Sequence, residues 1–92
     1  MAEKGMIYYF IGIGGIGMSA LAKILFDQGN AVMGYDKTKS PITEMLMSHG
    51  IEVVDEDSIE VIPEGFLEKS TQVIYTPAIS KTHLQYNYFL QQ

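Results

Sequence analysis

The residues from Gly12 to Gly17 could bind a phosphate group without any charged side chain. They read GIGGIG, which matches the pattern G-x-G-x-x-G, and Asp36 follows about twenty residues later. In this pattern Gly12 permits a tight turn, and the missing Cβ of Gly14 lets a pyrophosphate approach the backbone. Gly17 lets the next helix pack closely against a strand, and the free N–H groups at the start of that helix face the anion. We therefore expect a diphosphate site, whereas the simpler alternative is a turn that serves packing only.

Polar side chains near this turn could add contacts to the same ligand. Ser19 would lie in the first helical turn, where its hydroxyl could donate a hydrogen bond to the anion. Asp36 ends an apolar run, so its carboxylate could accept hydrogen bonds from a ribose or from a base N–H; the alternative is an ordinary surface aspartate. Lys37 and Lys39 could add positive charge near a phosphate, although loop lysines are usually just solvated.

Composition argues against several other kinds of site. The net charge is −5 and the chain has no cysteine, which disfavours an electrostatic nucleic-acid binder and excludes a disulfide framework or a thiolate metal site. His49 and His83 stand alone without metal-ligand spacing, and we expect them at a helix end and in a first helical turn. The acidic run 55–57 is typical of a solvated turn. No Walker sequence or nucleophile elbow is present, so we expect no catalytic residue and no metal ligand in this chain.

The elements that must position the turn follow an alternating pattern. Four short apolar runs predict strands, at 6–11, 31–35, 51–54 and 72–75. Helical spacing between them predicts one helix with Met18, Leu21, Ala22 and Leu25 on its buried face, and Gly29 after its end. A second helix is predicted from Ser40 as N-cap to Gly50, and a last one through Leu84, Tyr88 and Phe89 with Thr82 as its cap.

This order predicts an α/β fold, a Rossmann-like parallel sheet of about four to five strands flanked by helices, in a single small domain. The stretch 58–71 fits either a short strand or a helical turn before Pro63. The predicted order ends on a helix without a final strand, so we expect residues 1–92 to be one domain of a longer protein.

The amino-terminal region needs a separate check for a targeting segment. Residues 6–22 carry no charge, and Ala20-Leu21-Ala22 resembles a signal-peptidase site. Glycines interrupt the apolar run, and Lys4 is the only basic residue before it. We therefore expect a cytoplasmic protein without a membrane partner.

The stretch from Tyr9 to Ala22, YFIGIGGIGMSALA, resembles the opening of the Mur ligases. The resemblance continues in Gly34-Tyr35-Asp36, in Thr43 and Leu46 ahead of Gly50-Ile51, and in VIYTPAI from Val73 to Ile79. It covers most of the chain, and it is strongest for the members that join L-alanine to UDP-N-acetylmuramate, using ATP and Mg²⁺, in peptidoglycan precursor synthesis.

This resemblance implies that the chain is the amino-terminal domain that binds the UDP part of UDP-N-acetylmuramate. The central domain that binds ATP and Mg²⁺, and the last domain that assists with L-alanine, would lie outside these residues. The implied UDP site consists of Gly12, Gly14, Gly15, Ile16, Gly17, Met18, Ser19, Asp36, Lys37, Thr76, Pro77 and Ala78, with Ile79 in the same crevice. One departure concerns the Gly-His pair that these ligases often carry after the third strand, because Val53 to Glu56 contains no histidine.

Alternatives to this assignment stay open from the sequence. The glycine pattern and Asp36 also fit the NAD-binding half of an oxidoreductase. The ligase that reattaches recycled murein tripeptide shares the opening motif. A third alternative is a regulatory module of Rossmann type that binds no nucleotide.

Overall fold

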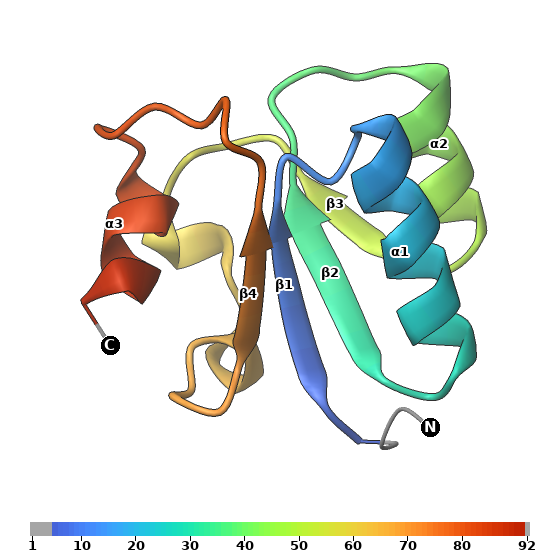
Figure 1. Ribbon diagram of the computed structural model, residues 1–92, viewed down its shortest axis with the longest axis horizontal. Helices are drawn as coiled ribbons and strands as arrows, with labels where there is room; N and C mark the ends of the chain where they lie inside the picture. Colours follow the sequence, from blue (N-terminus) through green and yellow to red (C-terminus); the bar gives the residue numbers. More distant parts are fainter. Residues whose placement is uncertain (1–4, 92) are drawn as a thin grey trace.

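The computed structural model describes residues 5–91, which form a parallel sheet covered by helices on both faces (Figure 1). The elements run in the order β1 (Ile7–Ile11), α1 (Ile16–Asp27), β2 (Ala31–Tyr35), α2 (Pro41–Ser48), β3 (Glu52–Val54), the 3₁₀ helices η1 (Ile59–Val61) and η2 (Glu64–Phe66), β4 (Gln72–Tyr75) and α3 (Leu84–Leu90). The sheet has 4 strands in the order β3-β2-β1-β4, and every pairing is parallel. The predicted Rossmann-like α/β fold is confirmed.

Local sequence explains where the first two helices begin and end. Gly29 follows α1 with φ +95°, and Gly50 follows α2 with φ +106°, so both occupy the left-handed region that glycine tolerates best. Ser40 caps α2, because its hydroxyl accepts the backbone N–H of Thr43 while the Thr43 hydroxyl accepts the N–H of Ser40. Pro41 then occupies the first turn, where its missing N–H costs no hydrogen bond.

The sheet has a hydrophobic core on each face. On one face α1 and α2 cover the strands, and the buried residues there are Phe10, Ile13, Ala22, Leu25, Val32, Leu46 and Ile51. On the other face α3 and the 3₁₀ helices cover them, and the buried residues there are Tyr9, Ile11, Met33, Tyr35 and Ile62. Since successive residues of β1 contribute to opposite cores, its unbroken apolar run is explained by burial on both sides.

Several local predictions differ from the structure. Leu21 is 39% exposed because the buried residues of α1 are Ser19, Ala22 and Leu25, and the centre of this face lies about 100° around the helix from Leu21. The ambiguous stretch 58–71 contains η1 and η2 and no strand. The cap of α3 is His83 instead of Thr82. No helix within residues 5–91 is both long and apolar enough to span a membrane.

Candidate functional site

The candidate site lies at the carboxyl ends of the strands, where the chain order across the sheet reverses. From β1 the chain continues to β2 on one side, whereas β4 pairs with β1 on the other side (Figure 1). Ligands of open parallel sheets bind at such a switch point. A crevice of about 320 Å³ opens there, which is in the size range of small-molecule sites. Its lining residues are Gly12, Tyr35, Asp36, Lys37, Thr38, Thr76, Ala78, Ile79, Ser80 and His83.

The turn between β1 and α1 brings the glycine-rich sequence to this crevice. Gly12 has φ +94°, and a Cβ at this position would lie 2.7 Å from Cγ2 of Thr76, so the prediction that Gly12 permits the tight turn is confirmed. Its N–H donates to the carbonyl of Tyr35 at 2.8 Å. The turn is therefore fixed against both neighbouring strand ends.

Most amides of the turn itself are already used within the chain. The N–H groups of Ile13, Gly14 and Gly15 donate to the Tyr35 carbonyl, the Asp36 carboxylate and the Gly12 carbonyl. The next N–H groups, those of Ile16, Gly17 and Met18, have no partner among residues 5–91. They form the first turn of α1, which contains no acidic residue. The unpaired donors are thus at the helix start instead of in the glycine turn.

Two glycines have roles that differ from those predicted. A Cβ on Gly14 would lie 2.7 Å from Oδ2 of Asp36 and 3.1 Å from Cγ2 of Thr43, so these side chains fill the space that we expected a pyrophosphate to need. A Cβ on Gly17 would meet nothing within 4 Å, so Gly17 is not required for packing α1 against β1. Of these two glycines, only Gly17 has open space around its missing Cβ, and it is exposed at the start of α1.

Asp36 holds this arrangement together. Its Oδ2 accepts the N–H of Gly14 at 2.8 Å, and its Oδ1 accepts the N–H of Thr38 at 3.0 Å. The carboxylate is half-buried between the crevice and a second cavity. Each oxygen retains a further lone pair, so Asp36 can still accept a hydroxyl from a ligand.

The other predicted residues divide into those that line the crevice and those that do not. Lys37, Thr76 and Ala78 line it, and Pro77 is exposed between the last two. Ser19 is only 5% exposed, and its hydroxyl donates to the carbonyl of Ile16 at 3.0 Å within α1. Its hydroxyl proton is therefore used inside the chain.

Sequence patterns missed part of the crevice wall. Tyr35, Thr38, Ser80 and His83 all line it. Tyr35 immediately precedes Asp36 and could have been inferred from the strand end, whereas His83 is brought in by the path of the chain after β4. No spacing in the sequence signals that contact.

His83 belongs to a polar cluster that ties α3 to the loop after β3. Asp57, predicted to lie in a solvated turn, accepts the N–H groups of Leu84 and Gln85 at 2.8 and 3.0 Å, and its Oδ1 lies 3.1 Å from Nδ1 of His83. Burial lowers the pKa of His83, an effect that the Asp57 carboxylate partly opposes. Asp57 therefore caps α3 from a distant segment.

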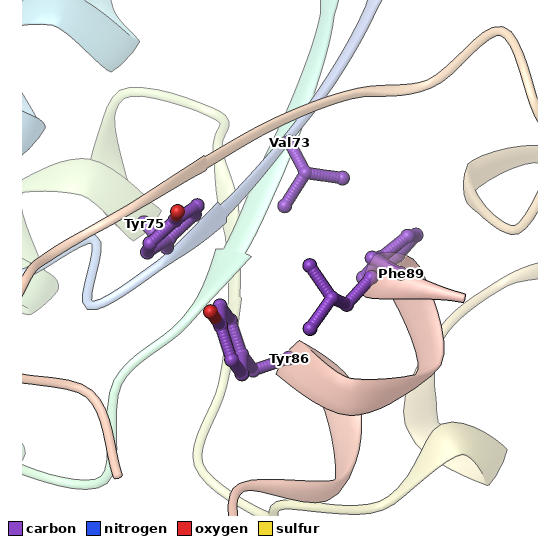
Figure 2. A pocket seen from close by; sticks show the side chains of 5 residues that line it. Val73, Tyr75, Tyr86 and Phe89 are labelled. Atoms are coloured by element: carbon purple, nitrogen blue, oxygen red, sulfur yellow. The ribbon is translucent and has the colours of Figure 1, made fainter. Parts of the chain in front are cut away.

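Two further cavities lie outside the crevice. One, of about 390 Å³, lies between β3 and α2 and includes the carboxylates of Asp36, Glu44 and Asp55, which disfavour an anion. The other, of about 120 Å³, is an apolar groove where Val73 and Tyr75 of β4 face Tyr86 and Phe89 of α3 (Figure 2). Neither of these two cavities lies both at the switch point of the sheet and beside the unpaired backbone N–H groups, so the crevice is the better candidate site.

Comparison with known proteins gives consistent results. Residues 7–92 match the family model described as Mur ligase family, catalytic domain. Two similar curated proteins are UDP-N-acetylmuramate–L-alanine ligases. The one from Flavobacterium psychrophilum is 51% identical over 84 residues, which are 91% of this chain and 19% of that protein. The one from Cytophaga hutchinsonii is 51% identical over 82 residues, which are 88% of this chain and 18% of that protein.

A solved structure also resembles this fold. The crystal structure of a UDP-N-acetylmuramate-alanine ligase from Thermotoga maritima has 31% sequence identity and a TM-score of 0.76, and the match covers 94% of this chain and 18% of that one. The chain thus spans about a fifth of the length of the curated relatives that it matches.

Proposed function

The chain belongs to the Mur ligase family, and from this premise we propose that it binds the UDP part of UDP-N-acetylmuramate. The protein that contains it would be an ATP-dependent ligase that adds L-alanine during peptidoglycan precursor synthesis. The curated relatives are named for that substrate and that amino acid, which supports the finer assignment. ATP and Mg²⁺ would be bound by residues outside this chain, and no residue here is assigned to them.

The observation that carries the proposal is the open start of α1. Three successive N–H groups, from Ile16 to Met18, lack partners within the described residues, and the helix dipole adds partial positive charge there. Gly17 costs helix stability, yet nothing in the described chain occupies the space of its absent Cβ. A diphosphate that approaches these amides would explain both features.

The nucleoside would extend from this point into the switch-point crevice. Gly12 lines the crevice and its carbonyl accepts the N–H of Gly15 at 3.2 Å, so the crevice and the start of α1 adjoin. Asp36 could accept a ribose hydroxyl with the lone pairs that its backbone bonds leave free. Lys37 is exposed beside it and would add positive charge near the phosphates.

The role of these residues is to bind and orient, since the chemical step would take place beyond the chain. The backbone amides would fix the diphosphate, and the loops after β1, β2 and β4 would fix the nucleoside. This orientation would present the lactyl carboxylate of the sugar nucleotide to the rest of the enzyme. We expect the 92-residue chain to bind UDP without catalysing any reaction.

Titration of the isotopically labelled chain with UDP, followed by NMR, tests the proposal. We expect the largest amide shifts at Ile16, Gly17 and Met18, with smaller shifts along the loop 76–80. NADH is the matched comparison, because the same fold and Asp36 also suit a dinucleotide. Tight binding of NADH without binding of UDP would instead indicate the oxidoreductase alternative, and binding of neither would favour a regulatory module.

The amino-acid substrate is tested with the longer protein. We expect turnover to require UDP-N-acetylmuramate, ATP, Mg²⁺ and L-alanine together. Faster turnover with murein tripeptide than with L-alanine would assign the protein to the recycling ligase, while the role of this chain in binding UDP would stay unchanged.

A further inference from the structure

His83 is placed at the wall of the crevice although it belongs to the start of α3. It is the N-cap of that helix, it lines the crevice, and it is only 8% exposed. Its ring packs edge to face with Tyr35, with 4.6 Å between the ring centroids. Tyr35 lines the same crevice and immediately precedes Asp36. The imidazole is thus buried at the site because the start of α3 positions it and Tyr35 of β2 packs against it.

The cap of α3 sets the tautomer of this imidazole. The backbone N–H of Tyr86 donates to Nδ1 at 3.3 Å, so Nδ1 carries no proton. Oδ1 of Asp57 lies 3.1 Å from the same nitrogen, and this carboxylate accepts the backbone N–H groups of Leu84 and Gln85. In the neutral ring the proton is then on Nε2, which is a hydrogen-bond donor.

Nε2 is the one buried side-chain nitrogen or oxygen without a hydrogen-bond partner in the described part of the chain. Buried polar groups in native proteins are nearly always paired, and exceptions often mark functional positions. The buried side chain of Gln85 illustrates the contrast, because its amide oxygen accepts from Tyr9 and its amide nitrogen donates to the carbonyls of Glu56 and Ser58. A residue that lines the crevice therefore has a buried donor left without an acceptor.

We propose that Nε2 of His83 donates a hydrogen bond to the nucleoside part of the bound nucleotide, so that His83 is a further ligand contact oriented by its cap bond to Tyr86. The acceptor would be a ribose hydroxyl or a carbonyl oxygen of a pyrimidine. Burial lowers the pKa of His83, which keeps the ring neutral near neutral pH and lets Nδ1 remain an acceptor. Because Nε2 is covered, the crevice wall must adjust slightly as the ligand enters. This inference rests on the proposed binding of UDP.

The test compares two histidines in the 92-residue chain. His83→Asn keeps a side chain that caps helices well and removes the atom at the Nε2 position. His49→Asn is the matched control, because His49 caps the end of α2 and pairs with Asp27 at the end of α1, whereas the candidate site adjoins the start of α1. We expect His83→Asn to weaken UDP binding about three- to tenfold and His49→Asn to leave it unchanged. Nitrogen shifts of the wild-type imidazole should show Nε2 protonated before UDP is added.

Ligand analogues identify the acceptor. 2′-Deoxy-UDP and 3′-deoxy-UDP each lack one ribose hydroxyl, and 2-thio-UDP and 4-thio-UDP each replace one carbonyl oxygen by a weaker acceptor. The analogue that lacks the true acceptor should bind the wild type and His83→Asn with nearly equal affinity. Inorganic pyrophosphate should also bind both equally. Equal UDP affinities for wild type and His83→Asn would overturn the inference and leave the proposed function standing. Equal loss of UDP and pyrophosphate would overturn it too, since it would show a merely structural role. Absence of UDP binding in the wild type would reject the proposed function itself.

Discussion

Oδ2 of Asp36 lies 2.8 Å from the backbone nitrogen of Gly14, so the acid that ends β2 holds the turn that follows β1. Asp36 also accepts the N–H of Thr38. A residue expected to contact the ligand therefore first positions the loop that presents the start of α1. This relationship explains why a Cβ cannot fit at Gly14.

Asp36→Ala removes the acceptor for two backbone donors. Hydrogen bonds to charged groups contribute about 1.5–3 kcal/mol when one partner is lost, and Asp36 is half-buried, so we expect a loss of about 2 kcal/mol in the free energy of unfolding. Urea denaturation measures it. Asp55→Ala is the control, because Asp55 is exposed and only pairs with Lys39 at 3.9 Å, and its loss should stay below about 0.5 kcal/mol. Equal stability of the two variants would contradict a positioning role for Asp36.

Alanine substitutions at two glycines should separate folding from binding. Gly17→Ala places a methyl group in open space, so stability should be unchanged or rise by up to about 1 kcal/mol, while UDP binding should weaken about tenfold or more. Gly14→Ala brings a methyl group against Asp36 and Thr43 and should cost about 1–3 kcal/mol in stability. Calorimetric titration and urea denaturation measure the two effects.

Gly65 provides the matched control for these substitutions. It also has open space around its missing Cβ, but it lies in η2, away from the crevice. Gly65→Ala should leave UDP affinity unchanged. If Gly17→Ala likewise bound UDP as tightly as the wild type, the start of α1 would not be the diphosphate site.

The spacing of apolar residues along the sequence predicted the strands and helices of this fold well. Apolar residues run continuously in a strand buried on both faces, whereas they recur every three to four residues along one face of a helix. The strand 31–35 and the strand 72–75 have the predicted bounds, and Ser40 caps α2 as its position before Pro41 indicated. The predicted cap of α3, Thr82, is wrong, because the neighbouring residue His83 caps this helix. The backbone path after β4 decides which of the two faces the helix start.

The site was predicted less completely, because its geometry depends on contacts between distant segments. The pattern G-x-G-x-x-G located the right turn, but it could not show that Asp36 fills the space at Gly14 or that Gly17 faces outward. Asp57 looked like a member of a solvated acidic run. Its contacts with Leu84 and His83 join positions almost thirty residues apart, which no local pattern records.

Gln85 should be the most sensitive polar residue of the core beneath α3. It is fully buried, accepts the Tyr9 hydroxyl at 2.8 Å, and donates to the carbonyls of Glu56 and Ser58. Gln85→Ala would leave these groups unpaired, so we expect a loss of about 3 kcal/mol or more in the free energy of unfolding.

Two further variants show whether this loss comes from the hydrogen bonds. Tyr9→Phe removes only the hydroxyl and should cost about 1–2 kcal/mol, and the double variant should lose less than the sum. Gln72→Ala changes an exposed glutamine of β4 and should cost less than about 0.5 kcal/mol. Additive losses at Tyr9 and Gln85 would show that their contact does not stabilise the fold.

Stability should fall as the pH drops, because of His83. Burial lowers the pKa of His83 in the folded chain below its ordinary value of 6.5, so below that pH the unfolded chain binds the proton more readily than the folded chain. The Asp57 carboxylate reduces this difference without reversing it. Urea denaturation between about pH 7.5 and about pH 5.5 should therefore show wild-type stability decreasing, by at most about 1.4 kcal/mol per pH unit for one proton. His83→Asn retains His49 and every carboxylate, so the free energy of unfolding of this variant should depend less steeply on pH. Parallel curves for the two proteins would show that His83 binds its proton equally well in the folded and unfolded chain.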